Sequence, residues 1–398
     1  MQPRVAIGRM ITRSVTSPWR LAGSRRLHAL RRTLSGRTPT VHYFHQFDDP
    51  YSQLAATQLG RLESRYRIRV EVHAVPPPEA AAAPAAEALR LWSARDAARW
   101  AQHHGLPCPE ADHAPPGFAA TEESLESGRR LRRRLGHYLG AMLHFEGEWY
   151  WGLDRLHYLE TRLIEAGLNR DSHGPCLPPP MLRFPSIGSD APAGRDPTTL
   201  DFFCSLRSPY TWLAVDRVRR LARHYGATLR LKFVLPMVMR GLPVPLDKRL
   251  YILADAKREA LRLGLPFGDV ADPVGQPVER GLALLHHAIG RGVGEEFLDS
   301  FLRGVFAEGI DAGSRRGLAR LAARAGLGET DIATALADGS WRDAAARHRE
   351  DLLATGLWGV PSFRVGDLPA VWGQDRLWMV EEDLIYLTRP TPQPPVSS

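Results

Sequence analysis

One stretch, Phe203 to Ala214 (FCSLRSPYTWLA), decides the fold of this chain. The apolar run Thr199 to Cys204 leads into it and predicts a buried strand, and helical spacing runs from Pro209 to Tyr225. Ser208 is a preferred N-cap, and proline suits the first helical position because its missing N–H would be unpaired there anyway. We therefore predict a strand that turns directly into a capped helix.

A similar stretch, Phe44 to Ala55 (FHQFDDPYSQLA), occurs 159 positions earlier, and this offset holds without a gap for more than sixty residues. In the eighteen positions that begin at Arg90 and Arg249, nine residues are identical. A later pair, WGLDRL from Trp151 and WGQDRL from Trp372, needs an offset of 221, so the second copy has 62 extra residues before its last motif. We interpret the chain as a tandem duplication with one enlarged copy.

The second copy shows the order of its elements most clearly. Thr228 to Leu235 alternate as a second strand, residues 246–350 are rich in helix, Ser362 to Val371 predict a hairpin, and Asp375 to Leu387 predict a final helix. A β-α-β start, a helical insertion and a β-β-α finish describe a thioredoxin fold. The predicted fold class is α/β, with two tandem thioredoxin-like (DsbA-like) domains, each with a helical insertion that is larger in the second.

A proline-rich segment separates the copies. Residues 168–197 contain seven prolines and are expected to be the interdomain linker. The expected segments are a basic, disordered extension (1–40), a degenerate first domain (41–167), this linker (168–197), the second domain (198–388) and a tail (389–398).

The chain is basic, but the charge is concentrated at one end. Its 398 residues suit two domains, and its formal net charge is +8. Residues 1–47 hold nine arginines and no acidic residue, and no nucleic-acid-reading motif accompanies them, so we expect no nucleic-acid partner.

We expect no membrane span, because no stretch approaches about 20 apolar residues. Three cysteines without a CxxC motif suit a reducing, cytoplasmic setting; an organellar presequence at the basic end is the alternative.

Three motifs together resemble the DsbA-like superfamily. They are the run DFFCSLRSPYTWLA, the triplet GVP at 359–361 and the motif WGQDRL from Trp372. More narrowly, they are similar to its glutathione-using branch, the 2-hydroxychromene-2-carboxylate isomerases and kappa-class glutathione transferases. The resemblance covers residues 199–388 well and 41–167 more weakly.

The resemblance implies glutathione as the cofactor and a set of site residues. In this branch a serine hydrogen-bonds the glutathione sulfur, which implies a catalytic role for Ser208. The proline of the triplet is cis and its neighbour presents its backbone to the cysteinyl group, which implies Val360 and Pro361. The Gly-[Gln/Ser]-Asp turn holds the γ-glutamyl end, which implies Gln374 and Asp375.

The physical chemistry of a helix start agrees with this site. A free thiol with a pKa near 8.5 is only about 3% thiolate at pH 7. Lowering that pKa by about two units requires roughly 2.7 kcal/mol of preferential interaction with the anion. One hydroxyl donor and a helix N-terminus can supply that interaction. Asp375, at the start of the final helix, can pair with an α-ammonium group.

The substrate side of the site carries a weaker signal. Lys248, Tyr251 and Arg258 follow the second strand and are candidates for substrate contacts, with a solvated helix face as the alternative. The isomerase branch usually has an asparagine soon after that strand, but this region reads LPMVMRGLPVPLDKR. The expected substrate is therefore only a class, a small aromatic or otherwise electrophilic molecule.

The first copy lacks these residues. Asp49, Met142 and Leu153 stand where the second copy has its serine, its proline and its glutamine, and only Asp154 and a tryptophan-glycine pair persist. A carboxylate at the serine position would repel a thiolate and raise its pKa. We expect residues 41–167 to be a degenerate copy that packs against the second one or contributes a wall of its cleft.

Three hypotheses of function follow. The favoured one is a glutathione-dependent isomerase or transferase, in which the thiolate adds to an aromatic or enone substrate. A non-catalytic glutathione-binding or scaffold protein is the second. A thiol-disulfide oxidoreductase is the third, disfavoured because the window SPYT at 208–211 has no cysteine. The histidines are scattered, and pairs such as His103-His104 and His286-His287 lack a partnered ligand set, so no metal is expected. A homodimer is left open.

Overall fold

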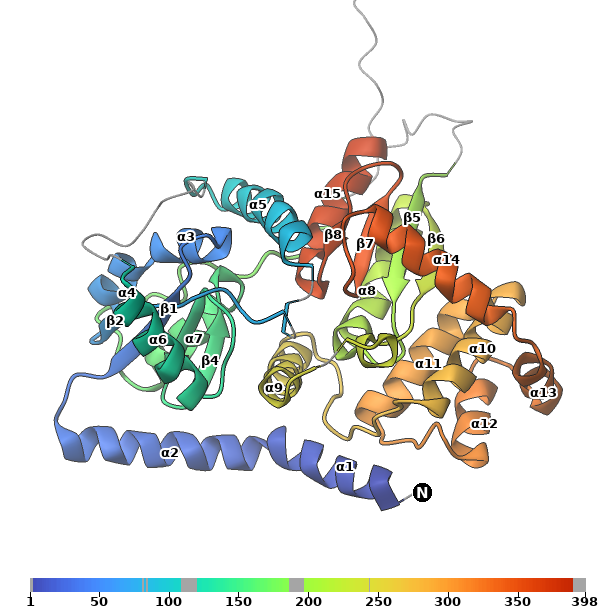
Figure 1. Ribbon diagram of the computed structural model, residues 1–398, viewed down its shortest axis with the longest axis horizontal. Helices are drawn as coiled ribbons and strands as arrows, with labels where there is room; N and C mark the ends of the chain where they lie inside the picture. Colours follow the sequence, from blue (N-terminus) through green and yellow to red (C-terminus); the bar gives the residue numbers. More distant parts are fainter. Residues whose placement is uncertain are drawn as a thin grey trace, which may run out of the picture. The chain divides into compact units, whose positions relative to one another are not determined.

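Two units make up the chain, and each is built on one four-stranded sheet (Figure 1). The first unit consists of residues 17–179 and 242–252, and the second of 1–16, 180–241 and 253–398. This computed structural model describes residues 3–80, 82–83, 85–108, 120–185, 197–242 and 244–388. Part of the expected linker, 186–196, and the expected tail, 389–398, lie outside the described residues.

The sheet of the first unit has the strand order β2-β1-β3-β4. Strand β1 (Thr40–His45) is parallel to β2 (Arg69–Ala74) and antiparallel to β3 (Met142–Phe145), which pairs with β4 (Glu148–Trp151). The helices of this unit are α2 (Pro18–Ser35), α3 (Pro50–Ala56), α4 (Leu59–Arg65), α5 (Ala86–His103), α6 (Glu122–Arg134), the 3-10 turn η1 (Leu153–Arg155) and α7 (Leu156–Glu165).

The sheet of the second unit repeats this order and these strand directions as β6-β5-β7-β8. Strand β5 (Thr199–Cys204) is parallel to β6 (Thr228–Phe233) and antiparallel to β7 (Ser362–Val365), which pairs with β8 (Val371–Trp372). The helices of this unit are α1 (Pro3–Val15), α8 (Pro209–Tyr225), η2 (Met237–Arg240), α10 (Gln276–Gly290), α11 (Gly294–Ala307), α12 (Arg315–Ala323), α13 (Glu329–Ala337), α14 (Trp341–Ala354), η3 (Gln374–Arg376) and α15 (Leu377–Thr388).

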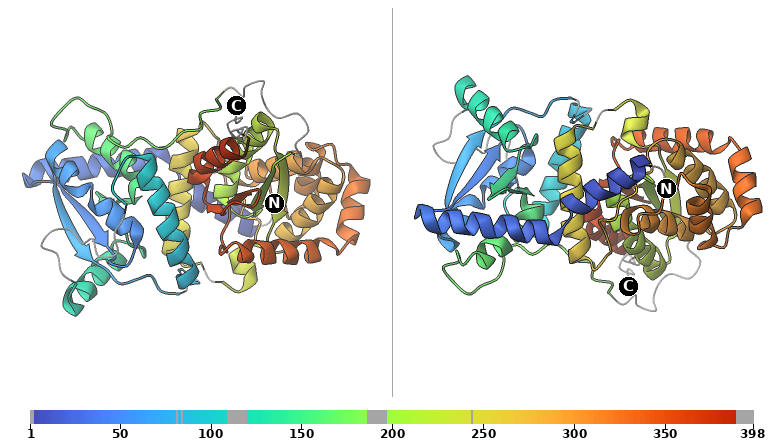
Figure 2. Two further views of the ribbon diagram at one scale, coloured as in Figure 1. Left: turned by 90° about the horizontal axis from the view of Figure 1, so that it is seen from above. Right: turned by 90° about the horizontal axis from the view of Figure 1, so that it is seen from below.

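The helical insertion of the second unit is one packed group. Helices α10 to α14, drawn in orange tones, gather beside α8 and the sheet (Figure 2). Leu282, Phe297 and Phe301 are fully buried within α10 and α11. The large insertion that the shift in offset predicts is therefore a second layer against α8. No helix among the described residues is long and apolar enough to cross a membrane.

The strand and helix at the start of the second unit have the predicted bounds, Thr199–Cys204 and Pro209–Tyr225. Ser208 has extended backbone angles, and its side chain accepts a hydrogen bond from the third helical N–H group. Gly226 ends the helix in the left-handed conformation, with φ of 62°. Both ends of α8 are thus encoded locally.

The basic N-terminal segment is helical, where the sequence analysis expects a disordered extension. Ser17 caps α2 through its side chain. Arg25 on α2 binds Glu148 with an N–O distance of 2.8 Å, and Arg9 on α1 binds Asp269 at 2.7 Å. These acidic partners lie more than a hundred positions away in sequence, so a local pattern could not reveal them.

Helix α9 (Leu246–Arg262) belongs to both units, because residues 242–252 group with the first unit and the rest with the second. Within the first unit, Lys248 Nζ donates a hydrogen bond to the carbonyl oxygen of Ala82 at 2.6 Å. The rings of Tyr251 and His137 lie with their centroids 4.7 Å apart. About two turns of a single helix, residues 246–252, therefore pack within the first unit.

Candidate functional site

Ser208 stands at the start of α8, beside the turn that leads into β7. Its Oγ accepts the N–H of Thr211 at 3.2 Å and donates to the carbonyl oxygen of Val360 at 3.4 Å. The Val360–Pro361 bond is cis. The prediction that this bond is cis and faces the start of α8 is confirmed.

The turn at 359–361 is held in place by its neighbours. Ser362 Oγ donates a hydrogen bond to the carbonyl oxygen of Gly359 at 2.9 Å. The N–H group of Gly373 donates one to the carbonyl oxygen of Pro361, also at 2.9 Å. A Cβ atom at Gly359 would collide with the ring of Trp372, so only glycine fits there. Gly359 thus leaves room for the Trp372 ring, and Gly373 supplies the N–H group that binds Pro361.

Gln374 does not reach solvent. It is 1% exposed, its Nε2 donates to Glu259 Oε2 at 2.8 Å and also to Asp375, and its Oε1 accepts from Arg217. Asp375 is half-buried. The sequence analysis assigned both residues to the γ-glutamyl end of glutathione, but the side chain of Gln374 is engaged inside the protein, where it orients the Asp375 carboxylate.

Arg217 is a member of this network that the sequence analysis missed. Its pKa is lowered to about 10, first by burial and then by the nearby Arg262. The carboxylates of Asp375 and Glu259 act in the opposite direction. Arg262 itself binds Glu259 at 2.7 Å, so the two guanidinium groups face two carboxylates. A signal was available, because Arg217 is spaced four residues from buried leucines on the apolar side of α8.

The three candidate substrate residues all lie on α9, and the division of the chain into two units falls between them. Lys248 and Tyr251 belong to the first unit, whereas Arg258 belongs to the second and is half-buried. Burial lowers the pKa of Lys248, whose ammonium group donates to a carbonyl oxygen of the first unit. The assignment of these three residues to the substrate side stays a prediction.

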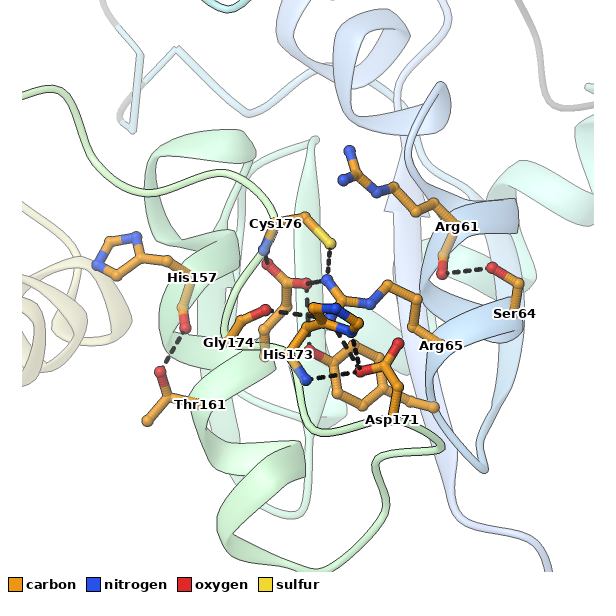
Figure 3. A network of polar contacts seen from close by, with 11 residues as sticks. Arg61, Ser64, Arg65, His157, Thr161, Asp171, His173, Gly174 and Cys176 are labelled. Atoms are coloured by element: carbon orange, nitrogen blue, oxygen red, sulfur yellow. Dashed lines mark hydrogen bonds and ion pairs between the residues drawn. The ribbon is translucent and has the colours of Figure 1, made fainter.

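None of the three cysteines stands in the window at 208–211. Cys204 is fully buried on β5, and burial raises its pKa far above the ordinary value. The sulfur of Cys176 faces Arg65, which donates a hydrogen bond to it (Figure 3). Burial raises the pKa of Cys176, and the nearby Glu160 carboxylate raises it as well. The hydrogen bond from Arg65 lowers this pKa but does not cancel the rise. Cys108 is exposed in the first unit. Neither Cys204 nor Cys176 is an activated thiol.

At the corresponding helix start in the first unit, the side chain of Asp49 is hydrogen-bonded within the protein. Asp49 caps α3 by accepting the N–H of Tyr51 at 3.3 Å, the N–H of Ser52 at 3.0 Å and the hydroxyl of Ser52 at 2.7 Å. The same hydroxyl oxygen accepts the N–H of Ala141 at 2.8 Å. Burial raises the pKa of Asp49 to about 6. At neutral pH this position therefore carries a carboxylate that would oppose a thiolate.

A polar hollow on the second unit contains none of the predicted site residues. It is lined by Arg219, Glu296, Asp299, Ser300, Arg303, Glu308 and Arg324. Its charges pair with one another, as Arg219 does with Glu296 at 2.6 Å and Arg324 with Glu308 at 2.6 Å. We do not assign a function to it.

Residues 199–384 match the DSBA-like thioredoxin domain family. The second unit carries a DsbA-like thioredoxin domain. This domain contains Ser208, the cis bond and the buried network described above.

Known proteins similar to the chain align with about half of it. A 2-hydroxychromene-2-carboxylate isomerase of Pseudomonas putida is 24% identical over 201 residues, which are 48% of this chain and 96% of the relative. Among solved structures, a 2-hydroxychromene-2-carboxylate isomerase is 23% identical and covers 48% of this chain and 95% of its own, with a TM-score of 0.41. The cytosolic disulfide reductase DsbM from Pseudomonas aeruginosa is 24% identical over 48% of this chain and 96% of its own, with a TM-score of 0.40.

Proposed function

We propose that the DsbA-like domain binds glutathione and stabilises its thiolate for addition to an aromatic or enone substrate, as an isomerase or a transferase. The observation that carries this proposal is the position of Ser208 Oγ, at the N-terminus of α8 and 3.4 Å from the carbonyl oxygen of Val360. A hydroxyl donor at the positive end of a helix dipole favours an anion there. The similarity to the isomerase of Pseudomonas putida supports the reaction class.

In this proposal each site residue has one task. The Ser208 hydroxyl turns from the Val360 carbonyl to the glutathione sulfur, since it has one proton to donate. The main chain of Val360 pairs with the cysteinyl group, and Asp375 pairs with the α-ammonium group. Glutathione held there would supply the sulfur nucleophile for addition to an electrophilic carbon, and in an isomerase it would be released unchanged.

We further propose that the first unit is a second thioredoxin-like copy without the site. The identical strand order and directions of the two sheets support a duplication. Asp49 at the helix start, and the contacts of Ser52 with Ala141, support the loss of thiol chemistry in that copy.

A non-catalytic glutathione-binding or scaffold protein is the second candidate. The engagement of Gln374 and Asp375 with Arg217 and Glu259 favours it, because part of the ligand-facing turn serves the protein's own packing. Thiol-disulfide exchange has no comparable support, since Cys204 is buried with a raised pKa.

A calorimetric titration with reduced glutathione tests the proposal, followed by an absorbance screen against chromene and naphthol-type aromatics. Binding together with turnover of at least one substrate is the expected result. Binding without turnover would favour the non-catalytic candidate, and the absence of binding at millimolar glutathione would contradict the enzyme and leave the scaffold.

A further inference from the structure

Three side chains on the sheet of the first unit converge on one point. His42 lies on β1, and Glu71 and His73 lie on β2. The Nδ1 atom of His42 is 3.0 Å from Nε2 of His73 and 3.4 Å from Oε2 of Glu71. One ligand atom from each residue falls within 4.8 Å of the others.

The register of the parallel strands brings them together. His42 stands opposite Glu71, and Phe44 stands opposite His73, so these side chains project from the same face of the sheet. The two histidines are 31 positions apart, and no spacing motif in the sequence marks them as a pair.

We propose that His42, Glu71 and His73 bind a divalent transition-metal ion of the zinc type. Zinc binds imidazole nitrogen at about 2.0–2.1 Å and carboxylate oxygen at about 2.0–2.2 Å, so donors of a tetrahedral site lie about 3.3 Å apart. The two measured separations lie close to this value. The side chains of His42 and Glu71 are 28% and 33% exposed, so solvent or a small ligand can take the remaining position.

The hydrogen bonds around the three side chains are compatible with such a site. One ring donates a hydrogen bond to the other, and a shift of that proton to the opposite ring nitrogen frees both lone pairs without any proton loss. Arg69 binds Oε1 of Glu71, which leaves Oε2 facing His42.

In the second unit, the equivalent positions of the sheet carry charged residues that pair with one another. There the buried Asp201 binds Arg230 at 2.6 Å, Lys232 at 3.4 Å and Arg364 at 3.2 Å, so the charges pair among themselves. In the first unit the fourth position is His144, opposite His42, and its buried Nδ1 atom has no hydrogen-bond partner among the described residues. The imidazole-rich set of the first unit therefore has nitrogen lone pairs that the charge-paired set of the second lacks.

The test is zinc binding by the full-length protein after removal of any histidine tag. Competition with a chromophoric chelator should give one tight site per chain, and Co²⁺ at the same site should give the visible absorption of a site with nitrogen and oxygen ligands. Loss of an outer-shell partner alone costs about 10- to 100-fold in affinity. His42→Ala, His73→Gln and Glu71→Gln should therefore each weaken binding by more than about tenfold.

His103→Ala is the matched control, because it removes an exposed imidazole of the same unit. It should leave affinity and stoichiometry unchanged. Thermal unfolding without metal identifies the variants that keep the fold, and the comparison uses those. Equal zinc affinity in the wild type and in a folded His42→Ala/His73→Gln double variant would overturn the proposal.

Discussion

Ser208 and Val360 are joined by a hydrogen bond from side chain to main chain, although 152 positions separate them in the sequence. The bond closes the gap between the helix start of β5-α8 and the turn before β7. The carbonyl oxygen of Val360 thus accepts the hydrogen bond that the proposed function assigns to the thiolate. In the proposed function, glutathione binding would require the Ser208 hydroxyl to leave the carbonyl oxygen of Val360 and donate to the glutathione sulfur.

Ser208→Ala should raise the pKa of bound glutathione by at least about one unit and slow thiol addition correspondingly, because the hydroxyl donor is lost. The fold should persist, since loss of an N-cap costs about 1 kcal/mol. Ultraviolet titration of the bound thiolate measures the pKa. Ser314→Ala removes another N-cap of the same unit, which accepts the N–H of Gly317 at 3.0 Å, and should leave the thiol unchanged. Wild-type activity in Ser208→Ala would contradict the enzyme proposal.

Asp375→Asn should weaken glutathione binding by about tenfold while leaving the pKa of the bound thiol unchanged, because it removes one ion pair at the other end of the ligand. Calorimetry gives the affinity. Asp154→Asn is the matched control, since Asp154 holds the equivalent place in the first unit, where it accepts Trp100 Nε1 at 3.1 Å. If both substitutions weaken binding equally, the assignment of the site to the second unit alone is wrong.

Asp49→Asn should stabilise the protein at pH 7 but not at pH 4. The folded-state pKa of about 6 lies above the ordinary 3.8, so the folded protein binds this proton more tightly and stability falls as the pH rises through that window. The gain at pH 7 relative to pH 4 should be about 1–3 kcal/mol. Urea unfolding at the two pH values measures it. Glutathione binding should not change.

His137→Asn should reduce the acid sensitivity of the first unit. Burial, and then Arg132, lowers the pKa of His137 to about 3, and its Nδ1 atom accepts the N–H of Leu139 at 3.2 Å. The unfolded chain takes up this proton near pH 6.5, so between pH 6.5 and 3 stability should fall by about 1.4 kcal/mol for each pH unit.

Unfolding of the His137→Asn variant between pH 4 and 7 should therefore show a shallower slope than the wild type. His103→Ala, which removes an exposed histidine, should keep the wild-type slope. Identical slopes in all three proteins would show that His137 is not the group that titrates.

The local parts of the fold could be predicted from the sequence. The strand Thr199–Cys204 and the helix Pro209–Tyr225 have their predicted bounds, because apolar run, N-cap, N1 proline and C-terminal glycine all lie within the elements themselves. Ser208 and the GVP triplet were predicted for the same reason, since short motifs mark both.

What the sequence did not reveal depends on distant pairing. The network of Arg217 with Gln374 joins residues 157 positions apart, and the pairing of His42 with His73 follows from strand register. The ordering of α2 depends on partners such as Glu148, which a pattern within the helix cannot indicate. In each case the deciding contact is tertiary, and single-sequence periodicity contains no information on it.

The division of α9 between the two units affects the outcome of truncation and of proteolytic cleavage. Because residues 242–252 lie in the first unit although they follow β6, the backbone leaves the second unit and re-enters it. A protein truncated at residue 180 would lose Tyr251, which packs against the apolar cluster around Phe44 and Met142. A single cleavage in the linker would likewise not yield two autonomous fragments. The first unit is thus expected to pack fully only in a chain that extends past Ile252.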